Sequence, residues 1–362
     1  MSMFTRLYRG ETRIQFIGTR KRWYFASAVL ILICVLSFVF RGFNYGVEFK
    51  GGTQFLIQST SITANQAETA FSDAGKTPAS PPQIVGQGAD RKVVVQTSHL
   101  TPAVQQTLEA KVAKSLNISV SKSMSVDSVS SSWGHDITVK AIEGLIVFLI
   151  VVSIYISLRF QWRMAVGGIL ALIHDLILAA GVYSIVGFEV TPSTVVGLLT
   201  ILGFSLYDTV VVYDKVSENA KDILSGSRTT FSEAANLAVN QTLMRSINTS
   251  LIALLPVAGL LFVGAGILGV GTIKDLALIL FVGLASGAYS SLFLATPIVV
   301  DLTERDPQYK ALAKRVAAKR SSEAKRAADA QLTGAIASAT RRSSGPAPAP
   351  KVGVRPDRRK RK

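Results

Sequence analysis

Gly203-Phe-Ser-Leu-Tyr-Asp-Thr-Val-Val-Val-Tyr-Asp214 is an apolar segment that carries a carboxylate, Asp208, near its centre. Without that residue the run is typical of a membrane-spanning helix. A charged carboxylate in hydrocarbon is costly, so such residues are rare and usually face a polar partner or a water-filled path. Burial also moves proton exchange by a carboxyl group towards neutral pH. The segment therefore predicts a proton carrier inside a membrane protein.

The rest of the chain has the composition of a membrane protein. It has 362 residues, of which 49% are hydrophobic, and apolar runs of the spanning length of about 20 residues recur along it. We predict a polytopic α-helical membrane protein with six transmembrane helices. The predicted spans are Trp23–Phe40, Ile137–Leu158, Met164–Val186, Thr194–Tyr213, Ser246–Phe262 and Leu276–Val300.

The distribution of basic residues predicts the orientation of these spans. Cytoplasmic connections are enriched in Lys and Arg, and here the basic residues gather before the first span, between the second and third, and between the fourth and fifth. We therefore expect both termini to be cytoplasmic, in the plasma (inner) membrane of a bacterium. The basic residues used are Arg6, Arg9, Arg13, Arg20, Lys21, Arg22, Arg159, Arg163, Lys215, Lys221, Arg228 and Arg245.

The segment 42–136 then lies on the extracytoplasmic side. It contains 7 Lys or Arg and 7 Asp or Glu, a balance typical of a solvated domain. Alternating and helical patterns follow each other in the order β-α-β-β-α-β, which is the ferredoxin-like arrangement. The expected strands are Thr53–Gln58, Gln83–Gly86, Lys92–Thr97 and Ile118–Val129, and the expected helices are Thr63–Ala74 and Thr101–Leu116.

The predicted organisation divides the chain into five parts. Residues 1–22 form a basic cytoplasmic N-terminus, 23–41 the first span, 42–136 the inserted domain, 137–301 the other five spans, and 302–362 a basic cytoplasmic tail. A capping box at Thr230–Glu233 predicts an amphipathic cytoplasmic helix near 230–243. The tail carries 17 Lys or Arg against 5 Asp or Glu, which gives it a charge of +12. Its end is predicted to be disordered, and contact with anionic lipid or simple solvation is the default expectation for its basic residues.

Several classes of function lack their residue patterns. The single cysteine, Cys34, cannot form an intramolecular disulfide, and no zinc-type spacing of Cys and His occurs. No glycine-rich phosphate loop, Ser/His/Asp set or pair of catalytic carboxylates is present. We therefore expect no cofactor, no metal and no enzymatic activity. The apolar run after the basic start has no small-residue cleavage pattern behind it, which favours a retained anchor.

Asp208 and Arg245 are the central candidate pair for a proton pathway. Arg245 opens the fifth span on the side where the fourth ends, at a depth from which its side chain can reach Asp208. An Arg beside an Asp favours the charged carboxylate, and protonation would release the pair. Two simpler alternatives stay open: Arg245 as an ordinary positive-inside anchor, and Asp208 as a polar group that only holds helices together.

Asp175 is the third candidate for this pathway. It lies with His174 near the middle of the third span. An imidazole can relay protons, but the pair can equally lock two helices together. We take His174 as a supporting polar residue, and we add four hydroxyl-bearing residues to that class: Ser205, Thr209, Ser246 and Thr249. Serines in the sixth span either line a hydrated path or let helices pack closely: Ser286, Ser290 and Ser291.

The order of motifs resembles the SecF family of the bacterial Sec protein-export machinery. The resemblance covers roughly Arg22–Asp301 and is most specific in Gly203–Asp214. The tyrosine at 207 replaces a usual Asn, and Glu48 a usual Asp. The other motifs that carry it are Gly46-Val-Glu-Phe-Lys-Gly-Gly52, His174-Asp175, Asn240-Gln-Thr-Leu-Met-Arg-Ser-Ile-Asn-Thr-Ser250 and Gly287-Ala-Tyr-Ser-Ser-Leu-Phe293.

The resemblance implies an accessory subunit that uses the proton motive force to promote late steps of polypeptide export. It further implies a SecD-like partner of similar architecture, the SecYEG channel, the SecA-driven translocase and an unfolded exported polypeptide. An alternative is a self-contained proton-coupled exporter of small molecules, which a single small external domain and only six spans disfavour. A purely structural scaffold is another, and Asp208 argues against it.

Overall fold

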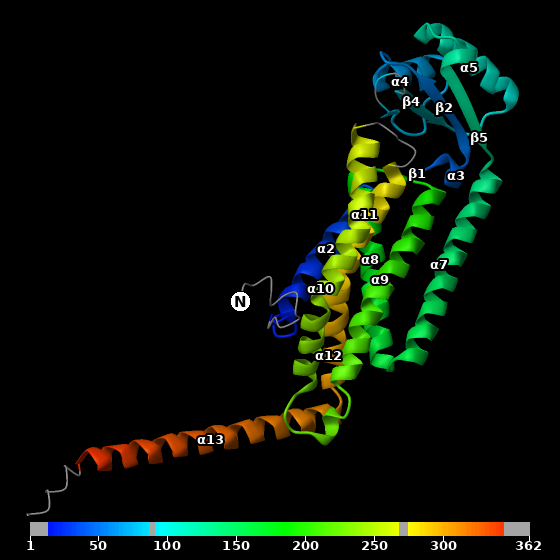
Figure 1. The fold of residues 1–362 in the computed structure, drawn as a ribbon. Helices are drawn as coiled ribbons and strands as arrows, with labels where there is room; N and C mark the ends of the chain where they lie inside the picture. Colours follow the sequence, from blue (N-terminus) through cyan, green and yellow to red (C-terminus); the bar gives the residue numbers. More distant parts are fainter. Residues whose placement is uncertain (1–13, 87, 89–90, 268–273, 344–362) are drawn as a thin grey trace, which may run out of the picture.

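The computed structural model describes residues 14–86, 88, 91–267 and 274–343 of the chain. Within these ranges six helices are long and apolar enough to cross a membrane, which confirms the six predicted spans. They stand side by side in one bundle (Figure 1). The spans are α2 (Arg20–Phe40), α7 (Ser131–Arg159), α8 (Trp162–Val186), α9 (Pro192–Asn219), α10 (Phe231–Ala258) with the π-helix η3 (Gly259–Ile267), and α11 (Lys274–Ser290) with η5 (Ser291–Ala295) and α12 (Thr296–Glu304).

Local sequence signals set the ends of the central helices. Helix α9 begins with a capping box between Thr191 and Thr194, followed by proline at the first turn. Its predecessor α8 ends at Val186 and is followed by the capping residue Gly187, whose φ of 78° is accessible to glycine at little cost. Helix α10 begins with the predicted capping box between Thr230 and Glu233.

The segment 230–243 differs from its predicted form as a separate helix along the membrane face. It is the first half of α10, which continues without interruption to Ala258. No glycine or proline occurs after Phe231 until Pro256, so nothing breaks the backbone hydrogen bonding between the amphipathic half and the apolar half. The polar pattern of the first half reflects its position at the end of the bundle.

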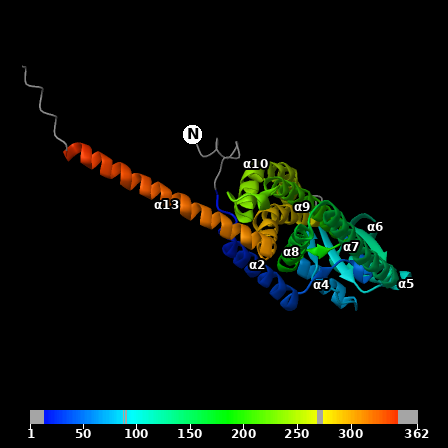
Figure 2. The same cartoon turned by 90° about the horizontal axis from the view of Figure 1, so that it is seen from below.

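Small residues allow the spans to approach each other closely. A Cβ placed on Gly283 of α11 would overlap the side chain of Ile201 on α9, and one on Gly181 of α8 would meet Cys34 of α2. Without a hydrophobic driving force between helices in lipid, such close backbone packing is a main source of association. The arrangement makes α8, α9 and α11 the centre of the bundle (Figure 2).

The segment inserted between α2 and α7 forms a sheet covered by helices. All neighbouring strands are antiparallel, in the order β3-β4-β2-β5. Phe55 on the central strand packs with Phe71 and Leu108 of the two covering helices, which forms a core separate from the bundle. The elements are β2 (Gly52–Gln58), α4 (Ala64–Asp73), β3 (Gln83–Val85), β4 (Lys92–Thr97), α5 (Pro102–Leu116), α6 (Val120–Ser123) and β5 (Met124–Val129).

One predicted strand of this segment starts later than expected. The alternating pattern of Ile118–Val129 suggested a strand throughout, but its first part is the short helix α6, and pairing with β2 begins at Met124. The cause is geometric, because the strand can pair only over the length of its partner. Opposite Met124 lies Ile57, one residue before β2 ends.

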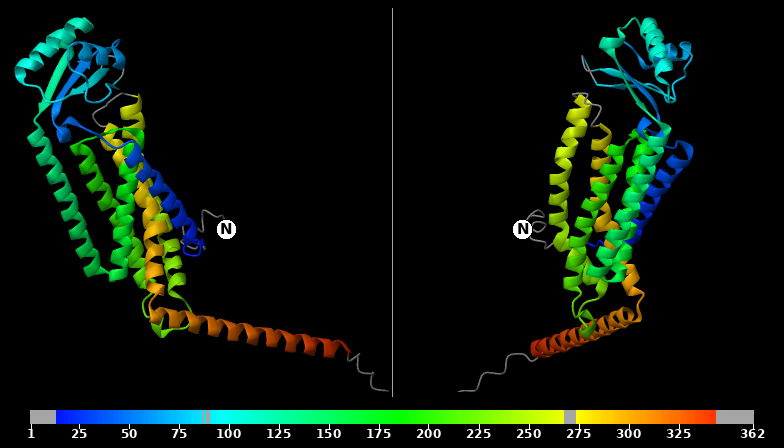
Figure 3. Two further views of the ribbon diagram at one scale, coloured as in Figure 1. Left: turned by 180° about the vertical axis from the view of Figure 1, so that it is seen from behind. Right: turned by 90° about the vertical axis from the view of Figure 1, so that its right-hand side faces the viewer.

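A short connection joins the inserted segment to the bundle. After α2 the chain forms β1 (Asn44–Tyr45), which pairs in parallel with β6 (Glu189–Val190) of the α8–α9 loop, and then the helical turn α3 (Val47–Lys50). Gly51 and Gly52 follow with φ of 71° and 151°, values that glycine adopts readily. These two glycines lead the chain from α3 into β2, and Figure 3 shows the inserted segment at this end of the bundle from two further sides.

At the opposite end of the bundle, α13 (Pro307–Ser343) runs crosswise to the spans and away from them (Figures 1 and 3). Ion pairs fix its first part: Arg163 to Asp306 at 2.5 Å and Arg320 to Glu233 at 2.6 Å. The helix includes the predicted helical segment Tyr309–Ala330. The predicted disordered end, 344–362, lies outside the described residues.

The segment before α2 is held against α10. Asn236 accepts hydrogen bonds from the backbone N–H groups of Phe16 and Ile17 at 2.8 and 3.1 Å. Asn240 accepts from the N–H of Ile14 at 2.9 Å and donates to its carbonyl oxygen at 2.9 Å. Two asparagines of one helix thus hold the backbone of this segment against α10.

Candidate functional site

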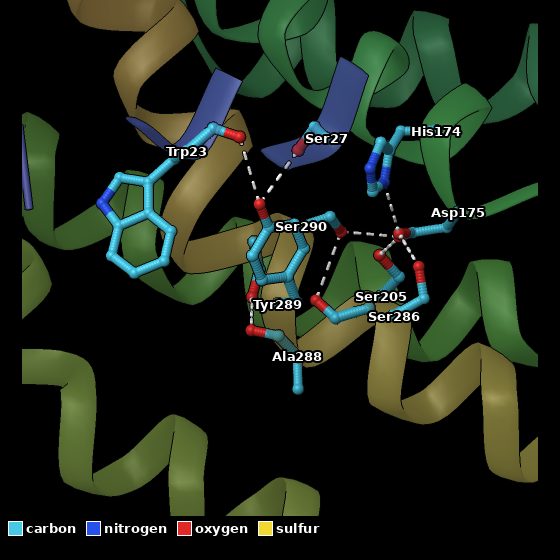
Figure 4. Close-up of polar contacts among 11 residues, drawn as sticks. Trp23, Ser27, His174, Asp175, Ser205, Ser286, Ala288, Tyr289 and Ser290 are labelled. Carbon is cyan, nitrogen blue, oxygen red and sulfur yellow. Dashed lines mark hydrogen bonds and ion pairs between the residues drawn. The ribbon is translucent and has the colours of Figure 1, made fainter. Parts of the chain in front are cut away.

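Asp175 lies at the centre of the bundle and is 1% exposed. Its carboxylate accepts hydrogen bonds from three serines: Ser205 of α9 at 2.6 Å, Ser286 of α11 at 2.6 Å and Ser290 of α11 at 2.7 Å (Figure 4). Two helices, α9 and α11, therefore supply the donors around one acid of α8. Hydroxyl donors offset part of the free energy lost when a carboxylate leaves water.

His174 lies beside this carboxylate. Its Nδ1 is 3.4 Å from Asp175 Oδ1, while its buried Nε2 has no partner among the described residues. The imidazole ring lies 6.0 Å from the ring of Tyr289, whose hydroxyl reaches Ser27 Oγ at 3.0 Å and the carbonyl of Trp23 at 3.2 Å. This chain of contacts connects the acid to the first span (Figure 4).

Asp208 is the second buried acid, at 3% exposure. It accepts hydrogen bonds from Ser246 of α10 at 2.7 Å and from Ser291 at 2.5 Å. Ser291 directly follows Ser290, which bonds to Asp175. The two carboxylates are therefore bridged by consecutive residues of one helix, although they belong to α8 and α9.

The backbone around these serines explains their placement. A Cβ on Gly287 would lie 2.9 Å from Ser205 Cβ, so the glycine allows α9 and α11 to meet where the hydroxyls gather. The π-helix η5 starts at Ser291. Single π-turns inside α-helices widen the turn and often occur at functional sites.

Arg245 does not form the predicted pair with Asp208. Its guanidinium donates to Tyr207 Oη at 3.1 Å on an exposed face, and within the described ranges it forms no ion pair. The reason is helical geometry, since successive residues point about 100° apart. Asp208 and Ser246 face the interior as a pair, while their neighbours Tyr207 and Arg245 face outward as a pair.

The four hydroxyl-bearing residues of the predicted supporting class fall into two groups. Ser205 and Ser246 contact the buried acids directly. Thr209 is buried at 2% exposure, and no contact with either carboxylate is seen for it. Thr249 donates to the carbonyl of Arg245 in its own helix at 2.8 Å, so its hydroxyl serves the backbone.

The sequence interpretation did not assign the serines of α11 and η5 to the site. Their spacing carried a partial signal, because Ser286 and Ser290 are four residues apart and share one helix face. Close helix packing predicts the same small residues, so composition could not separate the two uses. Tyr289 carried no signal at all, because its contacts with Ser27 and Trp23 depend on how α2 packs.

The chemistry available here is proton exchange. Each hydroxyl can donate and accept, and each of the five serines contacts one of the two acids: Ser205, Ser286 and Ser290 contact Asp175, and Ser246 and Ser291 contact Asp208. Among the described residues no group of three or more His, Cys, Asp or Glu side chains could hold a metal ion. The site therefore offers two protonatable carboxyl groups shielded from bulk water, and an imidazole beside one of them.

Two family models match the chain. "Protein export membrane protein SecD/SecF, C-terminal" matches residues 107–305, and "SecD/SecF GG Motif" matches residues 36–61. The second match contains Gly51 and Gly52, where the inserted segment joins the bundle. The first contains both buried acids and all five serines.

Curated relatives and a solved structure agree with these matches. The protein translocase subunit SecF of Streptomyces coelicolor is 46% identical over 87% of this chain and 83% of its own length. The SecF subunit of Mycobacterium tuberculosis is 46% identical over 89% of this chain and 74% of its own. The crystal structure of SecDF from Thermus thermophilus, a translocon-associated membrane protein, is 30% identical with a TM-score of 0.71. That match covers 82% of this chain and 39% of the SecDF chain.

Proposed function

The chain belongs to the SecF family of protein translocase subunits, and we propose that it uses the proton motive force to promote late steps of polypeptide export. Its place in the family makes it an accessory subunit of the Sec translocase. We add to this role its energy source, the proton motive force, and the side chains that use it. Asp208 and Asp175 are the proton carriers, and the serines between them are the relay.

The observation that carries the proposal is the pair of buried acids joined through Ser290 and Ser291. A purely structural polar contact needs one satisfied donor and acceptor, whereas here two buried carboxylates accept from adjacent serines of one span, Ser290 and Ser291. Carboxyl groups within spans are expensive and usually mark ion or proton pathways. Loading either acid with a proton changes which serines must donate, and hence which helix contacts are favourable.

The energy available from proton movement is adequate for this work. One elementary charge crossing about 100 mV releases about 2.3 kcal/mol. A two-state equilibrium needs only a few kcal/mol of bias to change its major population. Repeated protonation of Asp208 can therefore drive repeated rearrangement of α9, α10 and α11. Arg245 directly precedes Ser246, which contacts Asp208. When Asp208 changes its charge, the Arg245 side chain moves between Tyr207 Oη, its present partner, and the Asp208 carboxylate.

We assign the inserted segment to the extracytoplasmic side of the plasma (inner) membrane of a bacterium, with both termini cytoplasmic. The distribution of basic residues supports this orientation. We assign the segment itself to the ferredoxin-like class, and its strand order and two helices on one face support that assignment. In this position it is available to an unfolded polypeptide that emerges from the channel.

A SecD-like subunit is the expected partner in the membrane, because SecD and SecF are fused in the Thermus thermophilus relative. The exposed α9–α10 face supports this assignment, since it carries Arg245 and a Tyr207 that is 52% exposed. A guanidinium in a span is costly against lipid and requires cover or water. We further assign SecYEG and the SecA-driven translocase as partners, anionic lipid as the partner of the basic tail, and no enzymatic activity.

Substitution of the two acids tests the proposal. In membrane vesicles that also contain the SecD-like partner and the translocase, we expect Asp208→Asn and Asp175→Asn to abolish the stimulation of export by a proton gradient. Export driven by ATP alone should persist. Asp214→Asn is the matched control, because Asp214 lies on the same helix but is exposed and paired with Arg159 at 2.9 Å.

Equal stimulation by a proton gradient in the wild type and in Asp208→Asn, at equal subunit levels, would refute the role of Asp208. The same vesicles address the exporter alternative. If this chain alone, without a SecD-like partner, moved a small molecule on a proton gradient, the translocase assignment would give way to that alternative.

A further inference from the structure

A second set of carboxyl groups lies where the inserted domain, residues 52–129, meets the bundle. Glu189 belongs to β6, the short strand of the α8–α9 loop that pairs with β1. Gln96 of β4, only 7% exposed, donates through Nε2 to Glu189 Oε1. This hydrogen bond connects a side chain of the domain sheet directly to the bundle. Figures 1 and 3 show β1 and α3 at this junction.

Glu48 approaches the same place from α3. A Cβ placed on Gly46 would meet Glu48 Oε2 and would lie 3.0 Å from Glu189 Oε1, so both carboxyl oxygens lie beside Gly46. Glu48 Oε2 is fully buried and has no hydrogen-bond partner in the described part of the chain. A buried carboxylate oxygen without a donor is unfavourable by itself. Its burial becomes favourable if the neighbouring carboxyl group is protonated and donates a hydrogen bond to it.

Both acidic and basic groups lie around the pair. Asp275 of α11 adds a third carboxylate, and the pKa of Glu189 is affected by both Glu48 and Asp275. The ammonium of Lys274 lies over the Phe188 ring at 4.1 Å from its centroid.

Two further cations lie at the junction. Lys50 lies over the ring of Tyr45, at 5.7 Å from its centroid. The Arg41 guanidinium lies against Gly187, where a Cβ would be 3.1 Å from Nη2. Within the described residues none of these cations forms an ion pair with Glu48 or Glu189.

We propose that Glu48 and Glu189 form a proton-binding site that holds one proton between them, and that loss of this proton releases the inserted domain from the bundle. The shared proton supplies the donor that Glu48 Oε2 lacks. Its loss leaves two carboxylates facing each other. Glu48 belongs to α3, and only Gly51 separates α3 from β2, so separation of the carboxylates moves the domain away from β6. The site is distinct from the proton carriers Asp208 and Asp175.

The direction of the pH dependence follows from the docked state. Burial raises the pKa of Glu189 to about 7, with the charges of Glu48 and Asp275 acting in the same direction and the hydrogen bond from Gln96 opposing them. An ordinary glutamate titrates near 4.5. Below that pH both states are protonated and docking is unaffected. Between about 4.5 and 7 the docked fraction falls by up to about tenfold per pH unit relative to the released fraction, and it changes little above that range.

Distance measurements between spin labels on the domain and the bundle test this inference. The full chain, with its SecD-like partner in lipid nanodiscs, carries Cys34→Ser and labels at Gln106→Cys on α5 and Val196→Cys on α9. We expect one short distance at pH 5 and a growing population of longer distances as the pH rises to 8. A distribution that does not change with pH would overturn the proposal without any substitution in the site.

Two variants then separate the site from other acids. Glu189→Gln keeps a neutral, hydrogen-bonding side chain, so we expect the docked distance at every pH. Glu68→Gln, an exposed acid of the same domain, should keep the wild-type response and is the matched control. If the response persisted in Glu189→Gln but vanished in Asp208→Asn, the pH sensitivity would belong to the intramembrane acids. Persistence in Asp208→Asn and loss in Glu189→Gln supports the junction site, whatever the fate of the export proposal.

Discussion

Ser290 and Ser291 are consecutive residues that donate to different buried acids, Ser290 to Asp175 at 2.7 Å and Ser291 to Asp208 at 2.5 Å. Both hydroxyls are fully buried. In a regular α-helix neighbouring side chains point about 100° apart. Two consecutive residues of one helix can therefore donate hydrogen bonds to two different neighbouring helices. The sixth span thereby links the third and the fourth through polar contacts.

The first prediction concerns this link. Ser291→Ala leaves Asp208 with one donor, and Ser290→Ala leaves Asp175 with two. We expect each substitution to lower the free energy of unfolding by about 1–3 kcal/mol, the cost of removing a donor from a buried acceptor. Thermal unfolding in detergent measures the effect, and Ser153→Ala, whose hydroxyl bonds to its own helix carbonyl at 2.6 Å, is the control.

The double variant Ser290→Ala/Ser291→Ala extends this test. If the two acids act as one connected group, the two effects are non-additive by more than about 0.5 kcal/mol. Strict additivity would mean that each serine serves its own acid independently.

The second prediction separates two glycines of the same bundle. A Cβ on Gly283 overlaps Ile201, whereas one on Gly203 has nothing within 4 Å. We expect Gly283→Ala to destabilise the protein by about 1–3 kcal/mol through overpacking. Gly203→Ala should be neutral or stabilising by up to about 1 kcal/mol, because alanine favours helix more than glycine does. Parallel melting curves measure both, and equal losses would contradict the packing of α9 against α11.

The third prediction concerns the outward-facing pair Tyr207 and Arg245. If a SecD-like subunit covers this face, Arg245→Ala should reduce co-purification of that subunit in mild detergent by severalfold. Lys215→Ala is the control, because Lys215 pairs with Glu218 at 2.9 Å near the end of the same helix as Tyr207. Unchanged co-purification in Arg245→Ala would show that the guanidinium faces water instead of a subunit.

The fourth prediction concerns pH and the attachment of α13. The backbone N–H of Gln308, and after it the Arg163 guanidinium, hold the pKa of Asp306 below its ordinary value of 3.8. Because the pKa of Asp306 is lowered in the attached state, the charged carboxylate stabilises the attachment at every pH above the ordinary value. This stabilisation is lost only when the pH falls low enough to protonate Asp306. Limited proteolysis of the tail should therefore proceed equally at pH 6 and pH 8, and Asp306→Asn should accelerate it at both. A faster cleavage at pH 6 in the wild type would contradict this assignment.

The two acids were predictable from the sequence, because an acidic residue inside an apolar run is recognised without any knowledge of tertiary contacts. Asp208 and Asp175 were found in this way, and their depth in the spans was estimated from the helical rise alone. The hydrogen-bond partner of Asp208 was not predictable, because the direction in which a side chain points depends on the rotation of its helix about the helix axis. Arg245 and Ser246 are equally deep, and only packing decides which of them points inward.

Longer-range features were beyond sequence reasoning for a related reason. Glu48, Gln96 and Glu189 lie in three distant segments, and their meeting depends on how the inserted domain is seated on the bundle. The start of α10 was predicted from its capping box, but no comparable signal marks where an amphipathic half passes into an apolar half. A local signal such as this capping box was thus interpreted correctly, whereas features that depend on tertiary contacts were not predicted.

The attachment of the N-terminal segment to α10 has a consequence for biosynthesis. The asparagine that binds Phe16 lies 220 residues further along the chain. At synthesis rates of about 5–20 residues per second, the ribosome needs roughly 10–45 s to produce that partner. During this interval the first span is already made, yet the residues before it have no docking surface. The N-terminal segment therefore reaches its final place only after most of the polypeptide has been translated, which makes its closure a late step in assembly.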